Sequence, residues 1–245
     1  MHPGRRMPEK AASVEPGSER WLEAVHEARR DASPSAVAAA VILVALALVS
    51  WHAHWRLLGH ELWWIWLVVG FPYLLLAAVL LLGLTRLVEH DHRREIVLGL
   101  LSLVWVFNVL GVGVLVASLL SHSGSQITGR QLLLSGGVVL FTDAVAFGLA
   151  FWELDCGGPV ARALSTTPRK PDFQFPQDEN PKLARDNWSP RLWDYLYVSL
   201  TNSIAFSPTD AMPLTRPAKR LMAAESTLSV VTVLLVAARA VNILS

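Results

Sequence analysis

Five long apolar runs constrain this chain more than any other feature. They cover residues 36–55, 62–88, 96–121, 131–153 and 221–244, and short stretches with His, Arg or Gly separate the first four. An α-helix needs about 20 apolar residues to cross the hydrocarbon core of a bilayer. We therefore predict an all-α membrane protein with about five transmembrane helices.

The composition excludes several other classes. Of the 245 residues, 53% are hydrophobic and 17% charged, a balance that is unusual for a water-soluble globule. A net charge of +1 provides no basic surface for nucleic acid. The lone Cys156 cannot form an internal disulfide. No metal-ligand spacing, phosphate loop, dinucleotide fingerprint or nucleophile motif occurs, so we expect no metal, no cofactor and no enzymatic activity.

A sixth apolar segment, residues 192–207, is too short and too polar for a full span, and Pro208 stops it. We predict a short helix that enters the bilayer and returns. Such a segment must be buried in protein or line a water-filled cavity. Its polar interruptions are Ser199, Thr201, Asn202 and Ser203, and Asp194 is expected to cap or tilt the helix.

The chain divides into four regions. Residues 1–34 form a polar tail with a short amphipathic helix, and residues 35–153 form a four-helix transmembrane region. Residues 154–191 contain six prolines and several acids, which indicates an extramembrane loop. Residues 192–245 hold the short segment and the last transmembrane helix.

The distribution of Lys and Arg predicts the orientation. If the short segment returns, 18 of these residues lie on the side of the N-terminus and 3 lie on the other side. The positive-inside rule then places the N-terminus and the 154–191 loop in the cytoplasm of a cell membrane.

The residues from 192 onward read L-W-D-Y-L-Y-V-S-L-T-N-S-I-A-F-S-P-T-D-A-M-P-L-T-R-P-A-K-R-L. This segment resembles the pore region of potassium channels, in which a pore helix precedes a filter, a D-x-x-P-x-T motif and the Arg-Leu start of an inner helix. The matching residues are Asp210, Pro213, Thr215, Arg220 and Leu221. The resemblance implies a homo-oligomer of four copies around a shared path.

The filter positions differ from the potassium-channel pattern. Residues 205–209 contain no glycine, although glycines let filter carbonyls turn toward the ion. The resemblance therefore implies passage of monovalent cations with little potassium selectivity. Phe206 would narrow the path and Asp210 would form a ring of negative charge. The polar ligands would be Thr201, Asn202, Ser203, Ser207 and Thr209.

Over residues 36–245 the chain also resembles a family of bacterial multi-pass membrane proteins that has no established activity. That family has a Gly-rich loop, a later Phe-Pro-Asp/Glu loop and a W-D-F-L-Y-F-x-F-T segment followed by S-D. The corresponding residues here are Gly157, Gly158, Phe175, Pro176, Asp178, Glu179, Trp193–Tyr197 and Asp210.

Four polar residues inside the predicted spans stand out, namely Asn108, Asp143, Glu225 and Arg239. Asp143 is near the middle of the fourth span, where an ionisable group is costly unless it is paired, neutral or in contact with water. It is either a functional group or an acid bonded to Asn108 of the third span. We expect Arg239 to extend to the interface. Glu225 is expected to reach headgroup water or a neighbouring basic cluster.

Two functions remain open on the sequence. The first is a pore-loop membrane protein that passes cations. The alternative is a non-conducting scaffold or partner-binding protein in which Asp143 and Asn108 hold helices together. A proton-coupled transporter would require an internal repeat, and none is visible in the first four spans.

Overall fold

The computed structural model describes residues 18–58, 60–82, 93–120, 128–165, 170–182, 184–185, 188–205 and 211–244. Four long helices, α1 (Glu19–His52), α2 (Ile65–Leu82), α3 (Arg93–Leu120) and α4 (Gly129–Leu154), precede a 3-10 turn (Asp155–Gly157) and α5 (Pro159–Leu164). Strand β1 (Phe173–Gln174), α6 (Pro176–Glu179), α7 (Leu192–Ala205), β2 (Met212–Pro213) and α8 (Arg216–Leu244) complete the described part.

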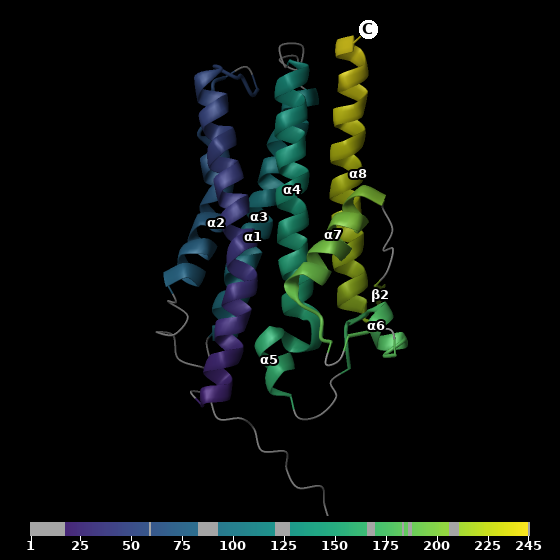
Figure 1. The fold of residues 1–245 in the computed structure, drawn as a ribbon. Coiled ribbons are helices and arrows are strands. Elements are labelled where there is room, and N and C mark those ends of the chain that lie inside the picture. Colours follow the sequence, from purple (N-terminus) through teal and green to yellow (C-terminus); the bar gives the residue numbers. More distant parts are fainter. Residues whose placement is uncertain are drawn as a thin grey trace, which may run out of the picture.

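Five helices in the described residues are long and apolar enough to cross a membrane, namely α1, α2, α3, α4 and α8. They run side by side, and α4 lies among the others (Figure 1). About two thirds of the apolar window of α4 is buried inside the protein, a larger share than in any of the other four helices. The all-α fold with five membrane helices that the sequence predicts is therefore confirmed.

Helix α1 is one continuous rod of 34 residues that contains Pro34. At 1.5 Å per residue it is about 51 Å long, well beyond the hydrocarbon core. The predicted surface helix and the first span are thus parts of the same helix. A stripe of buried alanines, including Ala32, Ala36 and Ala40, lets neighbouring helices pack closely against it.

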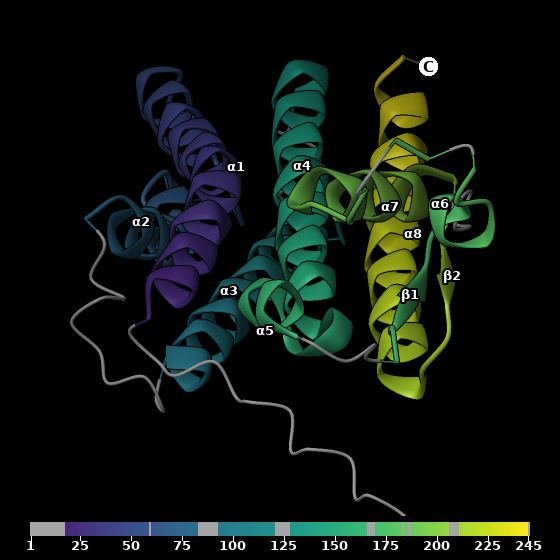
Figure 2. The ribbon, with the colours of Figure 1, turned by 60° about the horizontal axis from the view of Figure 1, so that its bottom comes forward.

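Helix α7 crosses the faces of α4 and α8 obliquely (Figures 1 and 2). It has 14 residues, which is about 21 Å and shorter than a full span. Asp194 accepts a hydrogen bond from the Arg191 backbone N–H at 2.8 Å, so of the two roles that the sequence leaves open, capping or tilting the helix, the structure shows the first. Gly148 of α4 permits the close approach, because a Cβ there would lie 2.7 Å from Leu196 Cδ2.

Both flanks of α7 lie at the same end of the helical bundle. The chain before α7 forms β1 and the chain after it forms β2, and these strands pair antiparallel with Phe173 opposite Pro213. The Leu214 N–H also donates to the Asp172 carbonyl at 2.8 Å. The chain segments before and after α7 therefore come together at one end of the bundle, as expected for the predicted re-entrant helix.

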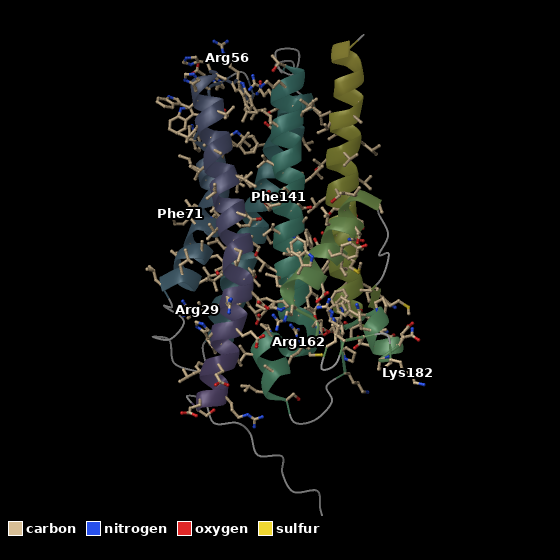
Figure 3. The ribbon with its side chains drawn as sticks, viewed as in Figure 1. Arg29, Arg56, Phe71, Phe141, Arg162 and Lys182 are labelled. Atoms are coloured by element: carbon tan, nitrogen blue, oxygen red, sulfur yellow. The ribbon has the colours of Figure 1, made fainter. Side chains whose placement is uncertain are left out.

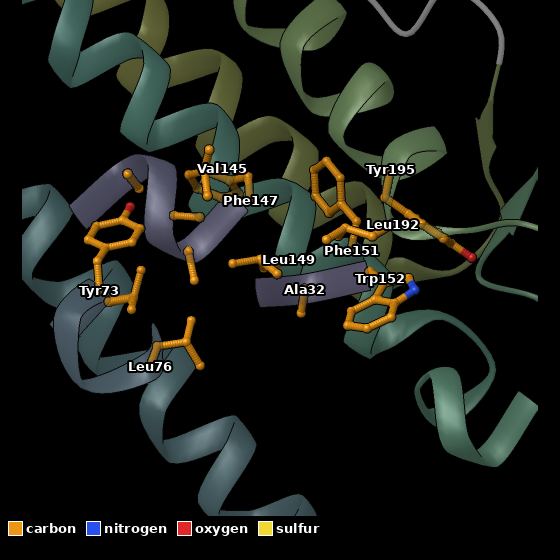
Figure 4. Packing of buried hydrophobic residues seen from close by; sticks show 14 of the residues in the cluster. Ala32, Tyr73, Leu76, Val145, Phe147, Leu149, Phe151, Trp152, Leu192 and Tyr195 are labelled. Carbon is orange, nitrogen blue, oxygen red and sulfur yellow. The ribbon is translucent and has the colours of Figure 1, made fainter. Parts of the chain in front are cut away.

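An aromatic cluster anchors the start of α7 to α4 and β1. Phe151 lies 5.1 Å from Phe173 between ring centroids, and Phe173 lies 6.1 Å from Tyr195. Phe147 and Leu192 extend the same buried core, which Figure 4 shows from close by. These contacts determine how deep α7 starts and where its C-terminal end points.

Candidate functional site

The side chain of Glu225 lies where α7 meets α8 and is fully buried. Three polar side chains of α7 donate hydrogen bonds to its carboxyl group. Ser199 contacts Oε1, Ser203 donates to Oε1 at 3.0 Å, and Asn202 Nδ2 donates to Oε2 at 2.6 Å. These four residues are called the Glu225 site below.

The site is tied to the surrounding backbone as well. The Ser199 hydroxyl lies 2.8 Å from the Ala144 carbonyl of α4, and Asn202 Nδ2 lies 3.0 Å from the Met222 carbonyl of α8. The Ser226 hydroxyl donates to Asn202 Oδ1 at 3.0 Å. These bonds hold the polar side chains of α7 in one orientation, with their oxygen and nitrogen atoms around a single carboxyl group.

The Glu225 site is deep in the protein. Nine residues separate Arg216, at the start of α8, from Glu225, which is about 14 Å along the axis. The site lies at the C-terminal end of α7, where the last carbonyls have no partner inside the helix. That end carries the negative pole of the helix dipole, so both the helix and the carboxyl group favour a positive charge there.

A second buried acid, Asp143 of α4, lies close to the Glu225 site. Asn108 Nδ2 of α3 donates to Asp143 Oδ1 at 3.1 Å, as the sequence predicts. The Tyr73 hydroxyl of α2 lies 2.7 Å from the Thr142 carbonyl and 3.3 Å from Asn108 Oδ1. Ser229 of α8, one helical turn after Glu225 and on the same face of the helix, is also fully buried. Polar groups from α2, α3, α4, α7 and α8 thus meet inside the bundle.

Neither acid faces a cation in the part of the chain that the structure describes. Within the described residues, no Lys, Arg or His forms an ion pair with Asp143 or Glu225. Both side chains are almost completely buried, at 1% and 0% exposed. A carboxyl group buried among neutral groups is stable when it is protonated or when it binds a cation.

A different acid, Asp155, organises the end of the bundle at which α7 starts. Its Oδ1 accepts the Asp172 N–H at 2.6 Å and the Phe173 N–H at 3.2 Å, and its Oδ2 accepts the Tyr195 hydroxyl at 2.6 Å. Burial raises the pKa of the Tyr195 phenol well above its usual range, so the hydroxyl keeps its proton and remains a donor. Arg162 Nη1 lies 3.7 Å from Asp155 Oδ2.

The residues predicted to line a pore have different outcomes. Asn202 and Ser203 face Glu225 of the same chain. Thr201 bonds to its own helix, 2.9 Å from the Tyr197 carbonyl. Arg239 belongs to α8, but its side chain lies outside the described residues. The loop residues Phe206, Ser207, Thr209 and Asp210 lie outside them too, so their predicted roles remain predictions.

The prediction that Glu225 reaches headgroup water or basic residues is wrong, because its side chain is fully buried. Glu225 turns instead toward α7, where Ser199, Asn202 and Ser203 lie on one helical face. Asn202 and Ser203 follow Ser199 by three and four residues, the spacing of neighbours on a helix surface. That spacing was the available signal. Tyr73 and Asp155 were missed as well, and their roles depend on partners far away in the sequence.

No group of three or more His, Cys, Asp or Glu side chains in the described part of the chain is arranged to hold a metal ion. The Glu225 site offers one carboxyl group, two hydroxyls and an amide, a set suited to a proton or a weakly held monovalent cation. It contains no thiol or imidazole for a transition metal.

Comparisons with known proteins provide no relative from which a function could be transferred. No protein-family model, no curated protein and no solved structure matches the chain. What the fold establishes is an integral membrane protein with five apolar helices.

Proposed function

We propose that this protein is a cation-conducting membrane protein of the pore-loop type, in which the Glu225 site binds the passing ion. The observation that carries the proposal is a fully buried carboxyl group without a cationic partner among the described residues, held at the C-terminal end of a re-entrant helix. Ion sites in membrane transport proteins use this combination, since helix C-termini and carbonyl oxygens stabilise cations at membrane depth.

The chemistry favours a small monovalent ion. A single buried carboxylate with hydroxyl ligands offers one negative charge, which balances one proton or one monovalent cation. The hydroxyls of Ser199 and Ser203 can turn their lone pairs toward a cation or donate to the carboxylate when no ion is present. The polar groups of the site therefore have partners both when the ion is bound and when it has left, as conduction requires.

An assembly of several copies follows from the position of α7. Trp193 and Ile204 are 77% and 67% exposed on this helix, and the last carbonyls of α7 have no partner within it. Polar backbone at membrane depth is stable only against protein or water. A second copy of the chain packed against α7 would satisfy this requirement, and the resemblance to potassium channels suggests four copies.

A non-conducting scaffold is the second candidate, and one observation favours it. Every oxygen of the Glu225 and Asp143 carboxyl groups that takes part in a described hydrogen bond faces a neutral donor of the same chain. A protonated Glu225 would act as a link between α7 and α8, in the way that polar side chains hold membrane helices together.

Ion flux in liposomes that contain the purified protein separates the two candidates. We expect the wild type to pass cations in preference to anions, and Glu225→Gln to reduce cation flux at least tenfold, because the amide keeps the shape but carries no charge. Glu225→Asp should retain part of the flux. The matched control is Glu95→Gln, a change of the same kind at an exposed position in the first turn of α3.

The scaffold predicts another pattern. Wild-type protein that is folded and oligomeric yet passes no ion under cation and anion gradients of either direction would contradict conduction. Equal cation flux through wild type and Glu225→Gln would leave conduction standing but remove Glu225 as its ion-binding group.

A further inference from the structure

A groove between α1, α4 and α7 lies on the side of α7 away from α8, and no function above uses it. Its volume is about 520 Å³. The walls are mainly apolar, with Pro34 and Ala38 from α1, Phe141 from α4, and Leu196 and Leu200 from α7. Pockets of 300 to 1,000 Å³ are typical of bound small molecules.

One end of this groove is charged. Asp31 of α1 and Arg191 before α7 both border it, and Arg191 Nη2 lies 3.1 Å from Glu27 Oε1. The same Asp31 and Arg191 also border a second hollow, of about 680 Å³, whose other walls include Glu27, Arg30 and His26. An apolar compartment and a charged compartment thus meet at Asp31 and Arg191.

The sequence of α1 places this meeting point at the membrane surface. Residues 32–52 contain no Asp, Glu, Lys or Arg, whereas the part of α1 before residue 32 holds all of its Asp, Glu and Arg residues. The uncharged stretch of 21 residues is about 32 Å long and matches the hydrocarbon core. Asp31 therefore lies at headgroup level, with the apolar groove on the lipid side and the charged hollow on the water side.

We propose that this pair of cavities binds a phospholipid with a zwitterionic ammonium headgroup, of the phosphatidylethanolamine type. One acyl chain would occupy the groove, the phosphate would contact Arg191, and the ammonium group would contact Asp31 or Glu27. Phe141 and Leu200 in the walls of the groove are 39% and 45% exposed, so the groove is open to the outside of the helical bundle, where a lipid of the surrounding bilayer can enter it. The proposal does not depend on ion conduction.

Headgroup charge, and not the acyl chain, is what selects the lipid. A lipid tail is as apolar in the bilayer as in the groove, so the tail fills space without a hydrophobic gain. The charged hollow is lined by both acids (Glu23, Glu27 and Asp31) and arginines (Arg30 and Arg191), and this mixture complements a headgroup that carries both signs. A purely anionic headgroup would place its charge against Asp31 and Glu27.

Native mass spectrometry of delipidated protein tests the proposal with added phosphatidylethanolamine and phosphatidylglycerol. We expect one phosphatidylethanolamine per chain, held at least tenfold more tightly than phosphatidylglycerol. Ala38→Trp fills the groove and should weaken phosphatidylethanolamine binding at least tenfold. The control is Val41→Trp, the same aromatic three residues further along α1 at a position that is 60% exposed.

Three results would overturn the assignment. Binding by Ala38→Trp that equals the wild type would exclude the groove, and equal affinity for the two lipids would exclude the headgroup. If Ala38→Trp does not fold, cross-linking of the wild type decides instead. A phosphatidylethanolamine with a photoactivatable acyl chain should cross-link within residues 34–38 and 192–200, and cross-links confined to α2 and α3 would contradict the proposal.

Discussion

Tyr73 bonds to residues 35 and 69 positions away in the sequence, and its single hydroxyl joins three membrane helices. It lies 3.3 Å from Asn108 Oδ1 of α3 and 2.7 Å from the Thr142 carbonyl of α4. Inside a bilayer no water can replace a lost partner, so each such bond orients the helices that it connects. Tyr73 therefore positions Asn108, and Asn108 in turn orients the Asp143 carboxyl group.

We expect Tyr73→Phe to lower the free energy of unfolding by about 1 kcal/mol, because the Thr142 carbonyl and Asn108 each lose a polar partner. Thermal unfolding of the purified protein in detergent measures the change. The control is Tyr197→Phe, since Tyr197 is 45% exposed and its substitution should leave the melting temperature unchanged. Equal melting temperatures for wild type and Tyr73→Phe would contradict the role of this hydroxyl.

Only part of this polar interior could be predicted from the sequence. Asp143 and Asn108 stand out because ionisable and amide side chains are rare in apolar runs, and their depths match. Tyr73 does not stand out, since aromatic residues are common in membrane helices. Glu225 lies near polar residues in the sequence, and its burial depends on the position of α7, which no local pattern reveals.

At the level of elements, the approach of α7 to α4 is controlled by one glycine. At Gly148 a Cβ would lie 2.7 Å from Leu196 Cδ2 and 3.0 Å from Leu196 Cα. The second contact is to backbone, so a side-chain rotation cannot relieve it. A Cβ added at Gly137, on the same helix, would have no such neighbouring heavy atom within 4 Å.

We therefore expect Gly148→Ala to push α7 outward and to destabilise the protein by about 1 to 3 kcal/mol, the usual range for overpacking. The rate of amide hydrogen exchange in α7 should rise as a result. Mass spectrometry of peptides from residues 192–205 measures that rate. Gly137→Ala is the matched control and should leave exchange in α7 unchanged. Unaltered exchange in Gly148→Ala would show that the contact between Gly148 and Leu196 does not limit how closely α7 approaches α4.

The length of α7 could be predicted from its sequence, but its docking site could not. Pro208 and the polar run before it mark a segment too short to span, and the structure confirms a helix of 14 residues. The glycine that receives α7 lies in the fourth apolar run, 48 residues before Leu196. Nothing in the sequence distinguishes Gly148 from Gly136, which approaches Val236 of α8 instead.

For the whole molecule, the basic side chains labelled in Figure 3 are unequally divided between the two ends of the bundle. Arg29, Arg162 and Lys182 lie toward the end at which α7 starts, and Arg56 lies at the opposite end (Figure 3). If α7 returns, as the pairing of β1 with β2 on its two flanks favours, 18 Lys and Arg residues lie on the side of the N-terminus and 3 on the other side. The positive-inside rule then predicts a cytoplasmic N-terminus.

Cysteine labelling of intact cells tests both the return of α7 and the orientation. In a Cys156→Ala background, we expect Lys182→Cys and Leu214→Cys to react only after the cells are permeabilised, because the positive-inside rule predicts that both lie on the cytoplasmic side. Arg56→Cys should react with an impermeant reagent from outside. Labelling of Lys182→Cys and Leu214→Cys from opposite sides would contradict the re-entrant path.

The pairing of β1 with β2 also determines what happens to α7 when it leaves its site. The two strands close the chain between Phe173 and Pro213 into a loop of about 40 residues, and closing a loop of this length reduces the volume that its contents can explore. The paired strands shorten the connections on both sides of a detached α7 and so raise its effective concentration near α4 above the value that the covalent chain alone provides. The strand pair thus acts as a tether.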